Sequence, residues 1–214
     1  VGGSAVKGEN LVIGVVDGGI WPENPAFFDR VDANGVPSNN PADTQVYGPG
    51  PASFTGGCVA GAGIDPAKHC NNKLVGIKYF NTGFKASGQT LHWTDFADSG
   101  RDSLSGATGH GGHGDHTAST AATINGTVVG TASGMAPRAR VAAYKVCWTY
   151  VNPAATDGTG SQNSCYNSDS VAAIDAAVAD GVNVINYSIS GSQTSVNDPV
   201  EQAFYRAALA GVFV

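Results

Sequence analysis

The sequence predicts an α/β protein with a three-layer core around a central, mostly parallel sheet. Short apolar runs typical of strands buried on both faces alternate with helical patterns, and the joints between them are short. Strands that alternate with helices in this way form parallel βαβ units. The length of 214 residues fits one domain with a sizeable core.

Apolar runs predict the strands of this sheet. Leu11–Val16 and Val141–Val146 are almost continuously apolar, as expected for strands that are buried on both faces. Val182–Ile189 predicts a further strand, and Val212–Val214 the start of another. Because Val214 lies inside an apolar strand pattern, we expect the sequence to be part of a larger domain.

Three segments predict helices. The segment 117–123 consists almost entirely of Ala, Ser and Thr, which suits a helix packed in a crowded core. Val171–Asp180 has apolar residues at a helical spacing, with Ser168 as a plausible N-cap and Gly181 as the stop signal. Asp198 followed by proline predicts the start of a helix that runs to about residue 210.

Two long stretches, 22–70 and 81–112, show no sustained periodicity. They are rich in Gly, Asn, Ser and Asp, the first in Pro as well, and predicted core strands lie on both sides of them. We therefore expect surface excursions from one domain, and not linkers between domains.

The composition excludes several classes of function. The formal net charge is −6, charged residues make up 13% of the chain, and Lys and Arg are scattered. No basic patch suggests binding to nucleic acid or to an anionic membrane. No apolar run reaches the roughly 18 residues that span a bilayer.

The four cysteines fall into two local pairs, Cys58 with Cys70 and Cys147 with Cys165. An even number of cysteines, with few Lys and many Asn, Ser, Thr and Gly, favours an oxidising compartment and two local disulfides. Four cysteines allow three connectivities, and the sequence does not choose among them. Four free buried thiols are the alternative.

Two short blocks carry side chains suited to catalysis. Asp17 follows the first apolar run, and reactive groups collect at the carboxyl ends of strands in open parallel sheets. His113 lies among glycines at the start of the small-residue helix, where it is well placed as a general base. These residues match two members of an Asp-His-Ser set. Taken singly, Asp17 is better explained by ordinary turn chemistry, whereas for His113 a surface loop is only the alternative.

The segment Ile185–Gly191 ends a predicted strand in small polar residues. Such an edge is able to pair with an extended peptide by β-augmentation. Taken alone, the pattern is explained more simply by a strand that runs into a turn.

A metal site is the alternative use of the histidines. His110, His113, Asp115 and His116 form a cluster with metal-ligand chemistry, but the zincin motif needs a Glu that this stretch lacks. We therefore predict no metal site and no cofactor. No loop of the EF-hand kind indicates calcium, although other oxygen sites leave weaker traces in a sequence.

Taken together and in order, these blocks resemble the subtilisin-like serine proteases (subtilases), most closely the plant cucumisin-like branch and its bacterial relatives. The likeness covers nearly the whole chain, and five ordered blocks are far more specific than one. The matching blocks are Val12–Glu23, Cys70–Gly76 followed by Tyr79–Asn81, Gly112–Ala122, Gly134–Pro137 through Tyr144–Trp148, and Asp169–Val184.

The resemblance implies a subtilisin-like fold and a role for each block. Asp17 would orient His113, and His113, not His110 or His116, would be the general base. Ser188, Ile189, Ser190 and Gly191 would belong to the strand that pairs with the substrate backbone. The resemblance also supports the pairings Cys58–Cys70 and Cys147–Cys165.

The resemblance further implies a secreted, extracellular serine endopeptidase. Residues 1–214 would then be the N-terminal portion of a single subtilase catalytic domain. Its expected partners are polypeptide substrates, the C-terminal catalytic segment with the oxyanion-hole Asn and the nucleophilic Ser, and a propeptide. No serine in a suitable frame occurs in these 214 residues, so we expect this chain alone to be inactive.

Three residues depart from the family pattern. Gly18 replaces a Thr or Ser, Asp115 replaces a Thr, and Ser190 replaces a Gly. We expect Asp115 to raise the pKa of a nearby imidazole through its charge, and Ser190 to crowd a bound peptide. The departures also motivate an alternative function, a degenerate subtilase domain that acts as a non-catalytic binding module.

Overall fold

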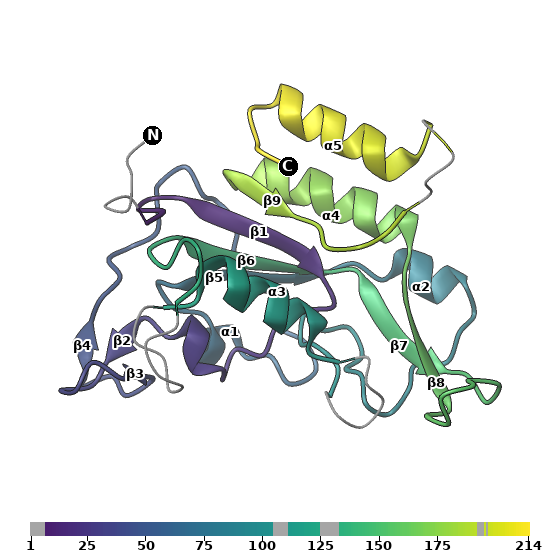
Figure 1. Ribbon diagram of the computed structural model, residues 1–214, viewed down its shortest axis with the longest axis horizontal. Helices are drawn as coiled ribbons and strands as arrows, with labels where there is room; N and C mark the ends of the chain where they lie inside the picture. Colours follow the sequence, from purple (N-terminus) through teal and green to yellow (C-terminus); the bar gives the residue numbers. More distant parts are fainter. Residues whose placement is uncertain (1–6, 105–110, 125–132, 192–194, 196) are drawn as a thin grey trace.

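The computed structural model describes residues 7–104, 111–124, 133–191, 195 and 197–214. Its centre is a four-stranded sheet in the order β5-β6-β1-β9 (Figure 1), and every neighbouring pair is parallel. The strands are Leu74–Tyr79 (β5), Arg140–Lys145 (β6), Val12–Asp17 (β1) and Val184–Asn186 (β9). The predicted α/β class is confirmed.

Helices cover both faces of this sheet and make three layers. Helix α3 (His113–Ala122) lies on one face, and α4 (Asn167–Asp180) and α5 (Pro199–Leu209) stack on the other (Figure 1). Adjacent residues of β1 point to opposite faces of the sheet. Val15 packs in the hydrophobic cluster with α3, and Val16 in the cluster with α4 and α5. All six residues of β1 are buried, as the continuous apolar run predicts.

Small elements fill the two stretches without periodicity. The elements are η2 (Pro25–Phe27), β2 (Arg30–Val31), β3 (Pro37–Ser38), β4 (Thr44–Gln45), α1 (Pro66–His69) and α2 (Thr82–Ala86). None of them is long, and in Figure 1 β2, β3, β4 and α1 lie below the sheet while α2 lies at its right-hand end. Strands β2, β3 and β4 form a separate antiparallel sheet in the order β3-β2-β4.

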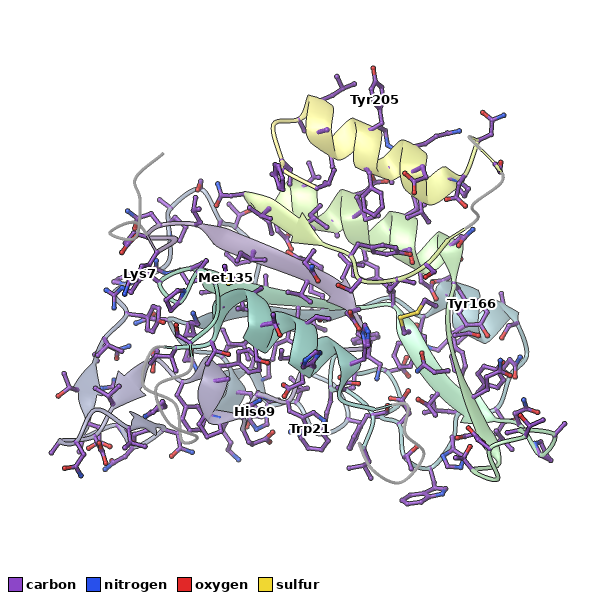
Figure 2. The ribbon with its side chains drawn as sticks, in the orientation of Figure 1. Lys7, Trp21, His69, Met135, Tyr166 and Tyr205 are labelled. Atoms are coloured by element: carbon purple, nitrogen blue, oxygen red, sulfur yellow. A yellow bond between two sulfur atoms is a disulfide. The ribbon has the colours of Figure 1, made fainter. Side chains whose placement is uncertain are left out.

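A hairpin projects from the end of the central sheet and was not predicted. Strands β7 (Cys147–Val151) and β8 (Ser161–Cys165) pair antiparallel, with Cys147 opposite Cys165. A disulfide joins these two cysteines at the base of the hairpin, where Figure 2 draws it in yellow. The other disulfide joins Cys58 to Cys70.

Two predicted boundaries were wrong. Helix α4 begins at Asn167, so Ser168 lies inside it and is not its N-cap. The backbone carbonyl of Tyr166 accepts the N–H of Ser170 and starts the helix without a side-chain cap. Strand β9 is shorter than predicted, because its pairing with β1 ends at Asn186.

Other predicted helix signals were correct. Asp198 caps α5, since its side chain accepts the N–H groups of Val200 and Glu201. Gly181 ends α4 with a φ of 86°, in the left-handed region that glycine adopts without strain. Among the described helices, none is long and apolar enough to cross a membrane.

Candidate active site

Asp17 is the last residue of β1, at the carboxyl end of the central sheet. The side chain is almost completely buried, with 2% of its surface exposed. A buried carboxylate must be hydrogen-bonded, and this one has three donors in reach. They are the Gly18 N–H at 2.6 Å, the Thr117 hydroxyl at 3.2 Å and the imidazole of His113.

His113 is the first residue of α3, and glycines shape the backbone around it. Gly112 has a φ of 85°, so the chain enters the helix through a left-handed residue. At position 114 a Cβ atom would collide with the carbonyl oxygen of Gly19, so glycine lets α3 approach the end of β1 closely. The close approach brings the first turn of α3 to Asp17.

The Asp17 and His113 side chains form a direct hydrogen bond. Asp17 Oδ1 lies 2.8 Å from His113 Nδ1. Because an ionised carboxylate only accepts hydrogen bonds, this contact assigns the proton to Nδ1 and leaves Nε2 as an acceptor. The imidazole is 56% exposed while Asp17 is buried, so the arrangement suits a base that takes a proton from a group at the protein surface.

A cleft of about 520 Å³ opens beside this pair. The predicted site residues Asp17, His113, Ser188 and Ile189 all line it. The cleft therefore brings together residues from β1, α3 and the segment after β9, of which Asp17 and His113 alone are 96 positions apart in the chain. Its further lining residues are Gly18, Gly111, Gly112, His116, Cys147, Asn163 and Cys165.

The predicted substrate strand lies along this cleft as an irregular segment. Ser188–Gly191 follow β9 without forming a strand, and Ser188, Ser190 and Gly191 are exposed. Within the described part of the chain, their backbone groups bond to no other residue. Ser190, unlike Ser188 and Ile189, is not among the residues that line the cleft.

The side chain of Asp115 is engaged away from the imidazoles. Its carboxylate accepts the Trp21 N–H at 3.1 Å and the Asn24 side-chain amide at 2.6 Å, which ties α3 to the segment after β1. Trp21 is labelled beside α3 in Figure 2. Burial raises the pKa of Asp115, against the effect of these two donors. No hydrogen bond or ion pair between described residues joins it to a histidine.

The metal alternative requires several ligand side chains close together. Among the described residues, no three His, Cys, Asp or Glu side chains gather closely enough to hold a metal ion. His110 lies outside the described residues. His116 is exposed and lines the cleft without an ion-pair partner in the described chain.

Sequence reasoning missed two polar groups at this site. Thr117 donates to Asp17, and its position four residues after His113 on the same helix was the available signal. Asp102 is buried beside Gly18 and the start of α3, and no local pattern marks it. It comes from the long stretch 81–112, which has no periodicity.

A comparison with known protein families shows which family the chain belongs to. The model of the subtilase family matches residues 8–214. The chain belongs to the subtilase family. The predicted resemblance is confirmed, and so is the subtilisin-like fold class that it implied.

Curated relatives of this subtilase are plant subtilisin-like proteases. SBT1.5 of Arabidopsis thaliana is 41% identical over 184 residues, covering 86% of this chain and 20% of the relative. SBT1.7 of the same plant is 36% identical over 206 residues, covering 96% of this chain and 23% of the relative. Glyma18g48580 of Glycine max is 39% identical over 192 residues, covering 86% and 20%. The chain thus spans about a fifth to a quarter of the length of these relatives.

A solved structure with a similar arrangement is that of fervidolysin from Fervidobacterium pennivorans, a keratinolytic enzyme related to subtilisin. It is 21% identical in sequence, with a TM-score of 0.43. The alignment covers 97% of this subtilase chain and 21% of fervidolysin.

Proposed function

We propose that this subtilase is a serine endopeptidase in which Asp17 and His113 are two members of an Asp-His-Ser triad. The observation that carries the proposal is the 2.8 Å hydrogen bond between the buried Asp17 and the exposed imidazole, at the edge of a cleft. The nucleophilic serine would come from a part of the protein outside these 214 residues.

The proposal gives each group a role in peptide hydrolysis. The serine hydroxyl attacks the scissile carbonyl carbon, and its proton passes to Nε2 of His113. Asp17 holds the proton on Nδ1 and stabilises the imidazolium that forms. The same imidazolium then gives its proton to the leaving amine, which leaves an acyl-enzyme. Water, deprotonated by Nε2, hydrolyses the acyl-enzyme and regenerates the serine.

The segment Ser188–Gly191 would bind the substrate backbone. Its exposed backbone groups bond to no other described residue, and they begin at the cleft that holds His113. An extended peptide that pairs with them would add a strand at this edge. Ser190 would face that peptide with a hydroxymethyl group where the family pattern has only hydrogen.

Secretion is part of the same proposal. Both cysteine pairs are disulfide-bonded, and the described chain has no free cysteine. Disulfides persist in oxidising compartments, so an extracellular location fits this chain. Polypeptide substrates, the rest of the catalytic domain and a propeptide are the proposed partners.

Fluorophosphonate labelling of the protein in its full natural length tests the proposal. We expect one serine to be labelled, and His113→Ala to slow labelling by about three orders of magnitude or more. His116→Ala is the matched control, since it removes an exposed histidine of the same helix, and labelling should stay within about tenfold of the native rate. Labelling that survives His113→Ala would reject the triad. No labelled serine in the native protein would favour the non-catalytic binding module.

A further inference from the structure

A second buried carboxylate lies behind the Asp17–His113 pair. Asp102 is 1% exposed, and its Oδ1 lies 3.2 Å from the point that a Cβ atom of residue 18 would occupy. The glycine at position 18, which departs from the family pattern, therefore leaves room for this carboxylate directly beside the residue that follows Asp17.

Asp102 hydrogen-bonds the start of the helix that carries His113. Its Oδ2 accepts the N–H of Asp115 at 3.3 Å, and the N–H of Gly112 acts on the carboxylate in the same sense, lowering its pKa. Gly112 is the N-cap residue of α3 and has no side chain with which to cap it. The first N–H groups of a helix need acceptors, and Asp102 supplies one for Asp115 from another part of the chain.

The backbone holds Asp102 firmly in this position. Its N–H donates to the Ile20 carbonyl at 3.1 Å, and the Ile20 N–H donates to the Gly100 carbonyl at 3.1 Å. The neighbouring Arg101 guanidinium bonds both carboxylate oxygens of Glu23 and the Gly63 carbonyl. Because these contacts fix the backbone around Asp102, its hydrogen bond to Asp115 also restrains the first turn of α3.

We propose that Asp102 is a positioning residue for His113: its ionised carboxylate anchors the first turn of α3 and so holds the imidazole in hydrogen-bond contact with Asp17. The inference rests on the proposed function, because it concerns the orientation of the proposed general base. Asp102 does not line the cleft, so it acts through α3 and not on the substrate.

The charges around Asp102 make this anchor sensitive to pH. Burial raises the pKa of Asp102 to about 6, and the negative charge of Asp17 on β1 acts in the same direction. Lys145 on β6 and the N–H donors of α3 oppose the increase. Lys145 is itself buried, and its ammonium group forms an ion pair with Asp95 at 2.5 Å. Asp95 therefore compensates part of the positive charge of Lys145. On α3 the ionisable groups are His113, which faces Asp17, Asp115, whose carboxylate is bound elsewhere, and the exposed His116.

The anchor therefore weakens on the acid side of this pKa. A protonated carboxyl accepts hydrogen bonds less strongly than a carboxylate, since bonds to an ionised group are about twice as strong. The imidazole therefore loses support as the pH falls through this range. The acid limb of the activity profile would then include the titration of Asp102.

Asp102→Asn mimics the protonated carboxyl and tests the proposal in the protein at its full natural length. We measure kcat and KM for a chromogenic peptide from pH 5 to pH 8. At pH 8 we expect kcat to be about tenfold below the native value, with KM within about twofold, because only the helix anchor is weakened. At pH 5 the two proteins should differ by less than about twofold, since native Asp102 is then largely protonated.

Asp98→Asn is the matched control, because it makes the same chemical change four residues away. Asp98 has a φ of 47° that Asn tolerates, and its exposed carboxylate bonds Asn81 and Lys85. Its profile should match the native one. A ratio of native to Asp102→Asn activity that does not change with pH would overturn the proposal, since a merely structural defect lowers activity equally at every pH.

A second variant keeps the proposal testable if Asp102→Asn does not fold. Gly18→Ala places a methyl group 3.2 Å from Asp102 Oδ1, so it puts an apolar group against the carboxylate and disfavours its ionised form. We expect the acid limb to move to higher pH by about half a unit or more. An unshifted limb would reject the role of Asp102. Activity that persists in His113→Ala would instead reject the proposed function itself.

Discussion

The carboxylate of Asp17 has two effects on His113: its charge stabilises the imidazolium, and its oxygen fixes the imidazole tautomer. Replacement of Asp17 by Asn tests the two effects separately. In the structure, Oδ1 accepts both the Gly18 N–H at 2.6 Å and the His113 Nδ1–H at 2.8 Å. The other oxygen, Oδ2, faces the Thr117 hydroxyl at 3.2 Å. An asparagine that placed its NH₂ at the Oδ1 position would point one donor at another donor, the Gly18 N–H.

The amide should therefore keep its oxygen toward His113 and its NH₂ toward Thr117. The Thr117 hydroxyl is able to accept this NH₂ while it donates to the Gly114 carbonyl, 3.0 Å away. With the amide oxygen in that place, the proton stays on Nδ1 and Nε2 remains a base. Only the negative charge is lost.

The magnitude follows from the lost attraction to the imidazolium. Unit charges about 4 Å apart at an effective dielectric constant of about 20 attract by about 4 kcal/mol, and we take about 3 to 4 kcal/mol as the loss. At about 1.4 kcal/mol per tenfold, kcat should fall roughly 10²- to 10³-fold. A substitution that also inverted the tautomer would cost about 10⁴-fold.

Two measurements on the Asp17→Asn protein in its full natural length decide between these outcomes. The first is kcat for a chromogenic peptide at pH 8, and the second is ¹⁵N NMR of the imidazole, which reports the nitrogen that carries the proton. A loss of about 10⁴-fold together with a proton on Nε2 would refute the assignment of donors around Asp17.

Further predictions concern stability and the cleft. Gly114→Ala should lower the unfolding free energy by about 1 to 3 kcal/mol and reduce kcat, because the new methyl group displaces α3 from β1; urea denaturation and peptide hydrolysis measure the two effects. The pKa of Asp102, raised from 3.8 to about 6, means that the native state binds its proton more tightly than the unfolded chain. Its contribution to stability is therefore greatest below about pH 4 and is lost as the pH rises through about 6. The unfolding free energy of the native protein minus that of Asp102→Asn should accordingly fall by about 2.5 kcal/mol from pH 4 to pH 8. Conversion of Cys147 and Cys165 to Ser should remove about 3 kcal/mol of stability and raise KM, because both cysteines line the cleft; a KM equal to the native value would show that they do not shape it.

The elements with strong periodicity were predictable from the sequence. Strands β1 and β6 and helix α5 appeared at their predicted places, within one or two residues at their ends. Each of them combines a continuous or periodic apolar pattern with local end signals, and Asp198 capping α5 is an example. Such signals act within a few residues, so tertiary contacts were not needed to find them.

Elements that depend on distant partners were not predictable in this way. Strand β5 and the β7–β8 hairpin carry mixed sequences, and only pairing with β6 or with each other makes them strands. The start of α4 was misplaced for a related reason. The carboxylate of Asp169 in its first turn accepts the N–H groups of Gly83 and Phe84, which are more than 80 residues away.

The sequence by itself determined the fold class, the family and the pair of residues proposed for catalysis, because each depends on ordered blocks of adjacent residues. Only the tertiary structure decided that Asp115 faces Trp21 and Asn24 instead of an imidazole, and that Asp102 supports the start of α3. Those arrangements depend on which buried N–H groups lack an acceptor after the chain has packed. The order of residues along the chain does not contain that information locally, since a buried carboxylate takes its donors from wherever the fold brings them.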